Sequence, residues 1–355
     1  MSLAPSFLQQ RLPLADLLDL RAFSEVCQSF AELYRVGLKV FDEEGNKVVD
    51  VKVGNADFCG YIWAKPVGRE QCIATVGRVK SDPVLSRQLT TEPGQCTDYY
   101  GFNTQAPFVN DARVRRALSL AIDRQSLTDN VAKNNFESAQ WFARPGLAGA
   151  PTIQDHPDLG VKFDPVKAKA ELEAYLKEKN LTGDQLDITL AFNTNAGYQQ
   201  IAEAIQGMWK QNLGIDVKLA NEPFETYLKT VVDPKNTPQV FQLGWCADYP
   251  DASNFHRDVF ALGGLQNPSG GGGLNWRNPD YEKLVAEAAR ELDPARRVDL
   301  YAQAEQILVN TDAVIVPLFW YISPTLTKPY VTRTPAASGW DHVEKWDIDL
   351  NARGQ

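Results

Sequence analysis

The sequence predicts an α/β fold with a mainly parallel sheet in its larger part. From residue 186 onward, apolar stretches with the twofold period of strands alternate with stretches that have the 3.6-residue period of helices. Strands are predicted at residues 186–192, 215–219 and 240–243, with a helix between the first two. Strands that are separated by helices in this order usually lie parallel in one sheet.

The predicted helices have clear start signals. A cap at Asn110 or Asp111 precedes an amphipathic stretch, because a short polar side chain can accept from the free N–H groups of a first turn. Three later helices are expected to begin with a capping residue followed by proline, at 164–165, 278–279 and 293–294. Another helical stripe runs from Ile201 to Leu213 and stops at Gly214.

Further strands are predicted at residues 95–104 and 313–321. The strand at 240–243 leads into the motif GWCADYPD at 244–251, and Pro250 to Asn254 are expected to form a loop. Ligands of open α/β sheets bind at the carboxyl ends of the strands, so Trp245, Cys246 and Asp248 are candidates for a binding wall. The alternative is a buried Trp and Cys followed by an ordinary turn.

The first 80 residues differ from the rest. Two amphipathic helices are predicted within residues 7–35, and a β-hairpin within residues 36–51 turns at 44–46. The gene product therefore divides into a small α+β segment, residues 1–80, and a larger part, residues 81–355. A chain of 355 residues is long enough for two or three domains.

Composition excludes several function classes. The formal net charge is −9, with 36 basic and 45 acidic residues. Residues 1–80 contain ten of each, so the acidic excess, 26 against 35, lies beyond residue 80 and should repel nucleic acid and anionic membranes. No apolar run is long enough to span a membrane, and the N-terminus does not have the pattern of a signal peptide.

Metal and catalytic chemistry have little support. Five cysteines and three histidines form no C-x-x-C pair and no Cys/His zinc spacing, and no nucleophile and base pair is evident. The glycine run at 268–273 lacks the Gly-Lys-Ser/Thr ending of a phosphate loop, so a flexible surface loop near the cleft is expected. We therefore expect neither an enzyme nor a bound metal or cofactor.

Five stretches occur in the order and spacing of a known family. They are YYGFNTQAPFVNDARVRRALSLAIDR, WKQNLGIDVKL, GWCADYPD, NPDYEKLVAEA and RVDLYAQAEQILVNTDAVIVPLFWY, and together they span about residues 78–350. This part resembles the family 5 solute-binding proteins of ABC importers, the oligopeptide-binding receptors. The resemblance implies a type II periplasmic-binding-protein-like lobe that binds peptides outside the cytoplasm and delivers them to permease and ATPase subunits.

The resemblance also implies roles for individual residues. Asp248 occupies the position of the carboxylate that pairs with a peptide's α-ammonium group, and a charge-assisted bond suits that role. Gln242 stands where some members that bind short peptides have an arginine for the peptide carboxylate. The expected ligand contacts are Asp248, Trp245, Tyr249, Gln242 and Asn103. Family members can also join cysteines at the positions of Cys96 and Cys246, which are therefore expected to lie within bonding distance.

The N-terminal segment, residues 10–80, resembles the PocR-like sensory domain, a relative of the PAS fold. The resemblance rests on the hairpin VFDEEGNKV followed by DFCGYI and GREQC. Cys59 and Cys72 are the positions a ligand or metal would use there, although both could be small buried hydrophobic residues.

The alternative function is a cytoplasmic ligand-sensing module of a signalling protein, which the N-terminal resemblance and the missing signal pattern would favour. Family 5 members have a first lobe of about 250 residues ahead of the stretch that contains Asn103, and this chain has about 80 residues of another kind. With most of one cleft wall missing, the 355-residue chain is expected to bind peptides weakly.

Overall fold

The computed structural model describes Ser24 and residues 38–41, 47–51, 88–132, 136–328, 330–333 and 346–349. The chain divides into two compact units, residues 1–88 and 89–355. The first unit holds the strands β1 (Leu38–Phe41) and β2 (Lys47–Val51), which pair antiparallel and confirm the predicted hairpin. The predicted helices at 7–35, apart from the helical Ser24, and both Cys59 and Cys72 lie outside the described residues.

The second unit is built on a six-stranded sheet with the order β4-β8-β3-β7-β5-β6. The strands are β3 (Gln88–Phe102), β4 (Glu137–Ser138), β5 (Thr189–Asn193), β6 (Lys218–Glu222), β7 (Val240–Cys246) and β8 (Ile315–Thr327). β5 runs parallel to both β6 and β7, whereas β3 runs antiparallel to β7, and β4 antiparallel to β8.

β3 and β8 are also antiparallel. An added Cβ at Gly94 would lie 2.8 Å from the Tyr321 carbonyl oxygen, while the Phe102 N–H donates to the Val314 carbonyl oxygen at 3.0 Å, so the residue numbers run in opposite directions. The expectation of a mainly parallel sheet is therefore correct for the pairs β5–β6 and β5–β7 but wrong for the pairs β3–β7, β3–β8 and β4–β8. Apolar periodicity identifies a strand, but it carries no information about the strand's direction.

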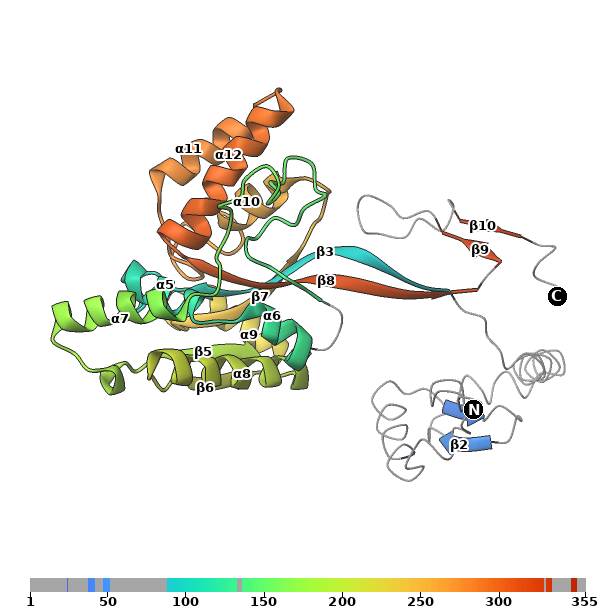
Figure 1. The fold of residues 1–355 in the computed structure, drawn as a ribbon, viewed down its shortest axis with the longest axis horizontal. Helices are drawn as coiled ribbons and strands as arrows, with labels where there is room; N and C mark the ends of the chain where they lie inside the picture. Colours follow the sequence, from blue (N-terminus) through green and yellow to red (C-terminus); the bar gives the residue numbers. More distant parts are fainter. Residues whose placement is uncertain are drawn as a thin grey trace, which may run out of the picture. The chain divides into compact units, whose positions relative to one another are not determined.

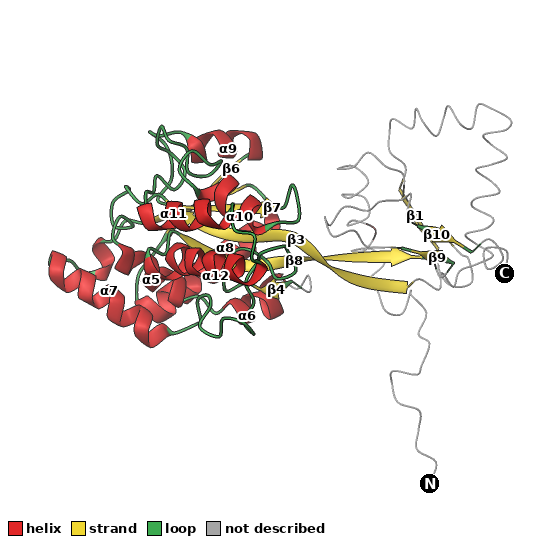
Figure 2. Cartoon of the chain, turned by 90° about the horizontal axis from the view of Figure 1, so that it is seen from above, coloured by secondary structure: helices red, strands yellow, loops and turns green. Residues whose placement is uncertain are grey.

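Helices cover both faces of the sheet (Figure 1). Tyr100 of β3 points to the face of the sheet that is covered by α8 (Ala196–Leu213), and its ring lies 6.4 Å from that of Trp209. The opposite side receives Tyr99, whose ring packs edge-on against Phe142 at 5.1 Å. Because successive strand residues point to opposite faces, this pair places β3 between two layers of the core. Beyond the helices, β3 and β8 continue together as a long pair (Figure 2).

The predicted helix starts are confirmed. Each of Asp111, Asp164, Asn278 and Asp293 accepts a backbone N–H of the first turn, and proline is the first helical residue in the last three cases. These residues cap α5 (Ala112–Leu120), α7 (Pro165–Lys179), α11 (Pro279–Ala288) and α12 (Pro294–Gln306). α8 ends at Gly214, whose φ of 72° suits glycine.

Among the described residues, two nine-residue helices were not predicted. α9 (Phe224–Val232) follows β6, and α10 (Ala252–Phe260) follows the motif at the end of β7. The prediction of a loop through Asn254 was wrong, because Asp251 accepts the Ser253 N–H as an N-cap and the helix begins at Ala252. Ser253 and Asn254 favour loops by composition, but the preceding cap allows them in a first turn.

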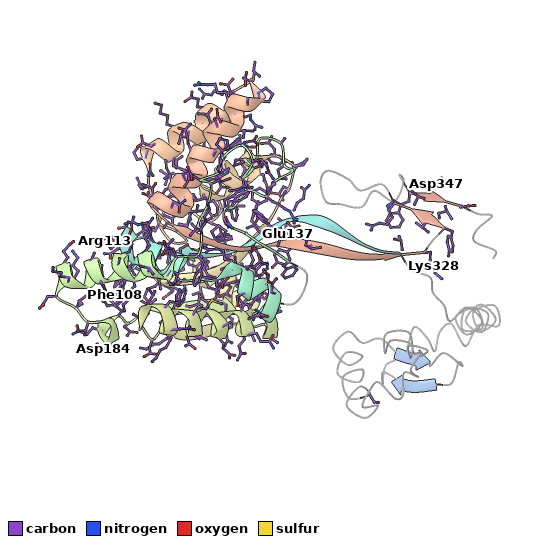
Figure 3. All side chains as sticks on the ribbon, in the orientation of Figure 1. Phe108, Arg113, Glu137, Asp184, Lys328 and Asp347 are labelled. Carbon is purple, nitrogen blue, oxygen red and sulfur yellow. A yellow bond between two sulfur atoms is a disulfide. The ribbon has the colours of Figure 1, made fainter. Side chains whose placement is uncertain are left out.

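The short elements complete the described chain. They are α6 (Arg124–Ser126), the π-helical turns Leu127–Ala132 and Ile307–Thr311, the 3₁₀ turn Gly183–Gln185, and the paired strands β9 (Val331–Thr332) and β10 (Asp347–Ile348). Glu137 of β4, labelled in Figure 3, lies opposite Trp320 of β8 and accepts the Arg144 guanidinium at 2.7 Å. Within the described residues, every helix is too short or too polar to cross a bilayer.

The glycine-rich loop is a packed turn. Gly272 and Gly273 both have positive φ, and a Cβ on either would lie 2.2 Å from a carbonyl oxygen, that of Val232 and that of Gln266 respectively. The Gly273 N–H donates to Val231 at the end of α9, near the start of β7. The loop therefore lies near the start of β7, whereas the motif lies at the other end of that strand.

Candidate functional site

The motif lies at one edge of the sheet. β5, β6 and β7 are parallel, so their carboxyl ends meet there, and Asp248 follows β7 by two residues. Trp245 is half-buried and packs against the main core, whereas Asp248 is exposed and Tyr249 is 36% exposed. The strand therefore delivers an indole and a carboxylate to the position where α/β proteins bind ligands.

A disulfide joins the end of β7 to β3. Cys96 and Cys246 are directly opposite in the antiparallel register, and their Cα atoms are 4.0 Å apart, well inside the limit of about 7 Å for a bond. The next residue, Ala247, donates its N–H to the Gln95 carbonyl oxygen at 2.9 Å. The segment that carries Asp248 thus leaves the sheet from a covalently fixed point.

Asn254 of α10 organises the motif. The residue is only 1% exposed. Its Oδ1 accepts both the Trp245 Nε1–H at 2.9 Å and the Asp248 backbone N–H at 3.0 Å. Its Nδ2 donates to Asp248 Oδ2 at 3.3 Å. The sequence analysis assigned this residue to a loop and gave it no role.

Asp258, one turn further along α10, is already compensated. Tyr249 donates its hydroxyl to Asp258 Oδ2 at 2.6 Å, and Arg257 donates to Oδ1 at 2.9 Å. Burial by itself would raise the pKa of Asp258, but the hydrogen bonds from Tyr249, Arg257 and Asn254 hold that pKa below its ordinary value. The hydroxyl of Tyr249 is therefore engaged within the protein, although the residue as a whole is 36% exposed.

Asp248 has no such cation. Across the described part of the chain, no Lys, Arg or His forms an ion pair with its carboxylate, and Asn254 is the side chain that donates to it. An exposed carboxylate that is held by an uncharged amide keeps its negative charge available to solvent or to a cationic ligand.

The other two expected ligand contacts are placed elsewhere. Gln242 is 2% exposed, its amide donates to Asp98 Oδ2 at 2.8 Å, and its backbone oxygen accepts the Tyr227 hydroxyl at 2.6 Å. Asn103 lies beyond the opposite end of β3, where its amide donates to the Thr237 carbonyl oxygen at 3.4 Å. Asn103 follows Cys96 by seven positions along extended chain, which corresponds to about 23 Å. The structure thus brings Asp248, Trp245 and Tyr249 together, but not Gln242 or Asn103.

A second carboxyl, Asp98, lies inside the sheet. It is fully buried, accepts from Gln242 and from the Tyr321 hydroxyl at 3.1 Å, and its Oδ1 has no hydrogen-bond partner. The Tyr321 hydroxyl also meets that of Tyr198 at 3.2 Å. Burial raises the pKa of Asp98 from 3.8 to about 8, against the lowering effect of Gln242 and Tyr321. A single Asp within an aromatic strand gave no sequence signal for this cluster.

Comparison with known proteins places the chain in a family. Residues 29–265 match the family described as bacterial extracellular solute-binding proteins, family 5 Middle. The chain belongs to this family. The match includes the motif with Asp248 and begins inside the segment that the sequence analysis compared with a PocR-like domain, so for residues 29–80 the PocR-like resemblance stays a prediction without support from this match.

Curated relatives of the chain are named as binding proteins. The chain is 33% identical over 249 residues to the periplasmic oligopeptide-binding protein OppA of Salmonella typhimurium, which covers 70% of this chain and 44% of that protein. It is 34% identical over 252 residues to the periplasmic murein peptide-binding protein MppA of Escherichia coli, covering 70% and 44%. The chain therefore spans less than half the length of these relatives.

Solved structures of similar proteins share the fold. The unliganded open form of the MppA periplasmic murein tripeptide binding protein matches with a TM-score of 0.63 and 30% identity over 78% of this chain and 51% of that one. Haemophilus influenzae OppA in complex with the peptide RPPGFSPFR matches with a TM-score of 0.59 and 26% identity, covering 77% and 52%. The predicted type II periplasmic-binding-protein-like α/β fold is confirmed. Among the described residues, no group of three His, Cys, Asp or Glu side chains could hold a metal ion.

Proposed function

We propose that this chain contributes to peptide binding as the solute-binding component of an ABC importer, outside the cytoplasm, and that Asp248 pairs with the α-ammonium group of the peptide. The protein partners would be the permease and ATPase subunits of that importer. The relatives reported above are named as periplasmic oligopeptide-binding and murein peptide-binding proteins, which supports this class of ligand. They give no support to the alternative of a cytoplasmic sensing module.

The observation that carries the proposal is the state of Asp248. Its carboxylate is exposed, is fixed by Asn254 at 3.3 Å, and has no cationic partner among the described residues. An ammonium group would supply the missing countercharge and up to three N–H donors. Trp245 precedes Asp248 in the sequence and Tyr249 follows it. The indole and the tyrosine ring would provide apolar surface for the peptide's first side chain.

Isothermal titration with paired peptides tests the proposal. A tripeptide to octapeptide library would be titrated into the 355-residue chain at concentrations up to the millimolar range, first with free and then with acetylated N-termini. An ion pair with a carboxylate that stays exposed contributes about 0–1 kcal/mol, so acetylation should lower the affinity by up to about fivefold. Asp248→Asn should lower the affinity for free peptides and remove this preference.

Asp280→Asn is the matched control, because it removes one exposed carboxylate from the start of α11 and leaves the motif intact. The control should retain the wild-type preference for free peptides. Absence of binding at millimolar peptide would contradict the proposed function of this chain. Binding that is equal for free and acetylated peptides would contradict the role of Asp248 alone.

A further inference from the structure

We infer that Asn254 is the positioning residue of the ammonium site, because its single amide group holds the Trp245 indole, the Asp248 backbone and the Asp248 carboxylate in one arrangement. The inference rests on the proposed function and adds to it a residue that does not itself bind the ligand. At 1% exposure, Asn254 has almost no surface to offer a peptide.

The backbone of Asn254 is held firmly. It lies in the first turn of α10, whose cap Asp251 accepts two bonds from Arg297 of α12, at 2.8 and 2.9 Å. The first residue of the helix, Ala252, donates its N–H to the Ala148 carbonyl oxygen at 2.9 Å. Because the backbone of this turn is fixed, the four hydrogen bonds of the Asn254 side chain can set the positions of the more exposed Trp245, Asp248 and Asp258.

The four bonds also fix which way the amide faces. Two N–H groups, from the Trp245 indole and the Asp248 backbone, meet Oδ1, and two carboxylates, of Asp248 and Asp258, meet Nδ2 at 3.3 and 3.1 Å. A reversed amide would place donors against donors and an oxygen against two carboxylates. Only a side chain with an acceptor on one side and donors on the other satisfies all four groups.

The arrangement gives the two carboxylates different roles. Asp258 is compensated by Arg257 and by the Tyr249 hydroxyl, whereas Asp248 receives the neutral amide and keeps its charge directed outward. Asn254 therefore binds both carboxylates without neutralising the one that is exposed. Holding Asp248 in one rotamer also reduces the conformational entropy that a ligand would otherwise have to remove on binding.

Hydrogen exchange tests the positioning without any ligand. In the ¹⁵N-labelled full chain, exchange of the Trp245 indole N–H and the Asp248 amide N–H would be compared in wild type, Asn254→Ala and Asn254→Asp. Loss of one hydrogen bond of about 1.4 kcal/mol corresponds to a tenfold change, so Asn254→Ala should accelerate both exchanges about tenfold. Asn254→Asp keeps the acceptor but places a carboxylate oxygen against the Asp248 and Asp258 carboxylates, so it should also accelerate both exchanges.

Asn267 supplies the matched control. It is also fully buried, donates to the Phe260 and Trp276 carbonyl oxygens, and accepts the Trp276 N–H, all away from the motif. Asn267→Ala should lower the overall stability but leave both motif exchanges unchanged relative to the global rate. Equal acceleration in this control, or none in Asn254→Ala, would overturn the inference.

Peptide titration then connects positioning to recognition. Both Asn254 variants should reduce the ratio of affinities for free and acetylated peptides toward one, Asn254→Ala because Asp248 is no longer held and Asn254→Asp because it cannot donate to Asp248. An unchanged ratio in Asn254→Ala would overturn the connection to the ammonium group. Absence of peptide binding by the wild type would instead refute the proposed function, while the exchange rates would still decide whether Asn254 positions the motif.

Discussion

Replacement of Asp98 by asparagine should change how the stability of the protein depends on pH. The Asp98 carboxyl is fully buried, one of its oxygens has no hydrogen-bond partner, and burial raises its pKa to about 8. Between pH 3.8 and pH 8 the folded protein therefore binds one proton that the unfolded chain has released. Stability must fall as pH rises through this window and become constant above it, because the folded state binds more protons than the unfolded state.

The magnitude follows from the width of that window. Each pH unit corresponds to about 1.36 kcal/mol, so the three units between 3.8 and 7 amount to about 4 kcal/mol of lost stability in wild type. Asp98→Asn cannot ionise, and its side-chain oxygen can still accept from Gln242 and Tyr321. Burial also raises the pKa values of Tyr198 and Tyr321, so both hydroxyls stay neutral throughout this range.

Urea denaturation followed by tryptophan fluorescence, from pH 4.5 to pH 8.5, measures the effect. The free energy of unfolding of Asp98→Asn minus that of wild type should rise by a few kcal/mol across this range. Asp216→Asn, which removes an exposed carboxylate just before β6, should show no comparable slope. A difference between Asp98→Asn and wild type that is the same at pH 4.5 and pH 8.5 would refute the reasoning.

Two further changes should lower stability. Reduction, or replacement of Cys96 and Cys246 by serine, opens a loop with a sequence separation of 150 and should cost about 5 kcal/mol in the chain-entropy model, so an unchanged urea midpoint would argue against the bond. Glu305→Ala would remove the buried carboxylate that accepts the Phe142 and Ala143 N–H groups at 3.0 and 2.6 Å, and two unsatisfied donors should cost about 2–6 kcal/mol. A thermal midpoint within one degree of wild type would contradict this expectation for Glu305.

Local signals in the sequence were sufficient for most of the second unit. An aspartate or asparagine before a proline marks a helix start. The capping side chain accepts the free N–H groups of the first turn, and the proline that follows has no N–H group that would need a partner. The start of α7 at Pro165 and the end of α8 at Gly214 follow from such signals. The antiparallel pairing of β3 with β7 and β8 does not, because it depends on how distant strands meet.

The candidate site also combines residues that the sequence predicted with residues whose roles depend on contacts between distant parts of the chain. Asp248 and Trp245 were predicted from their place at the carboxyl end of a strand and from the resemblance of their motif to that of a family. Asn254 was not, because its role depends on a turn of helix folding back to bring its amide to both residues. Gln242 and Asn103 were assigned by position in a motif, and only the register of β3 and β7 shows that one is enclosed and the other lies at the far end.

The disulfide makes the middle of the second unit a closed covalent ring. Everything from Cys96 to Cys246 lies within it, including α5, α7, α8, α9 and the parallel strands, whereas Asp248, α10 and β8 lie outside. A single break of the backbone inside the ring would leave both pieces attached to each other. Asp248, two residues beyond the closure, is thereby attached to β3 by a much shorter path of bonds than the 150 residues of chain that separate them.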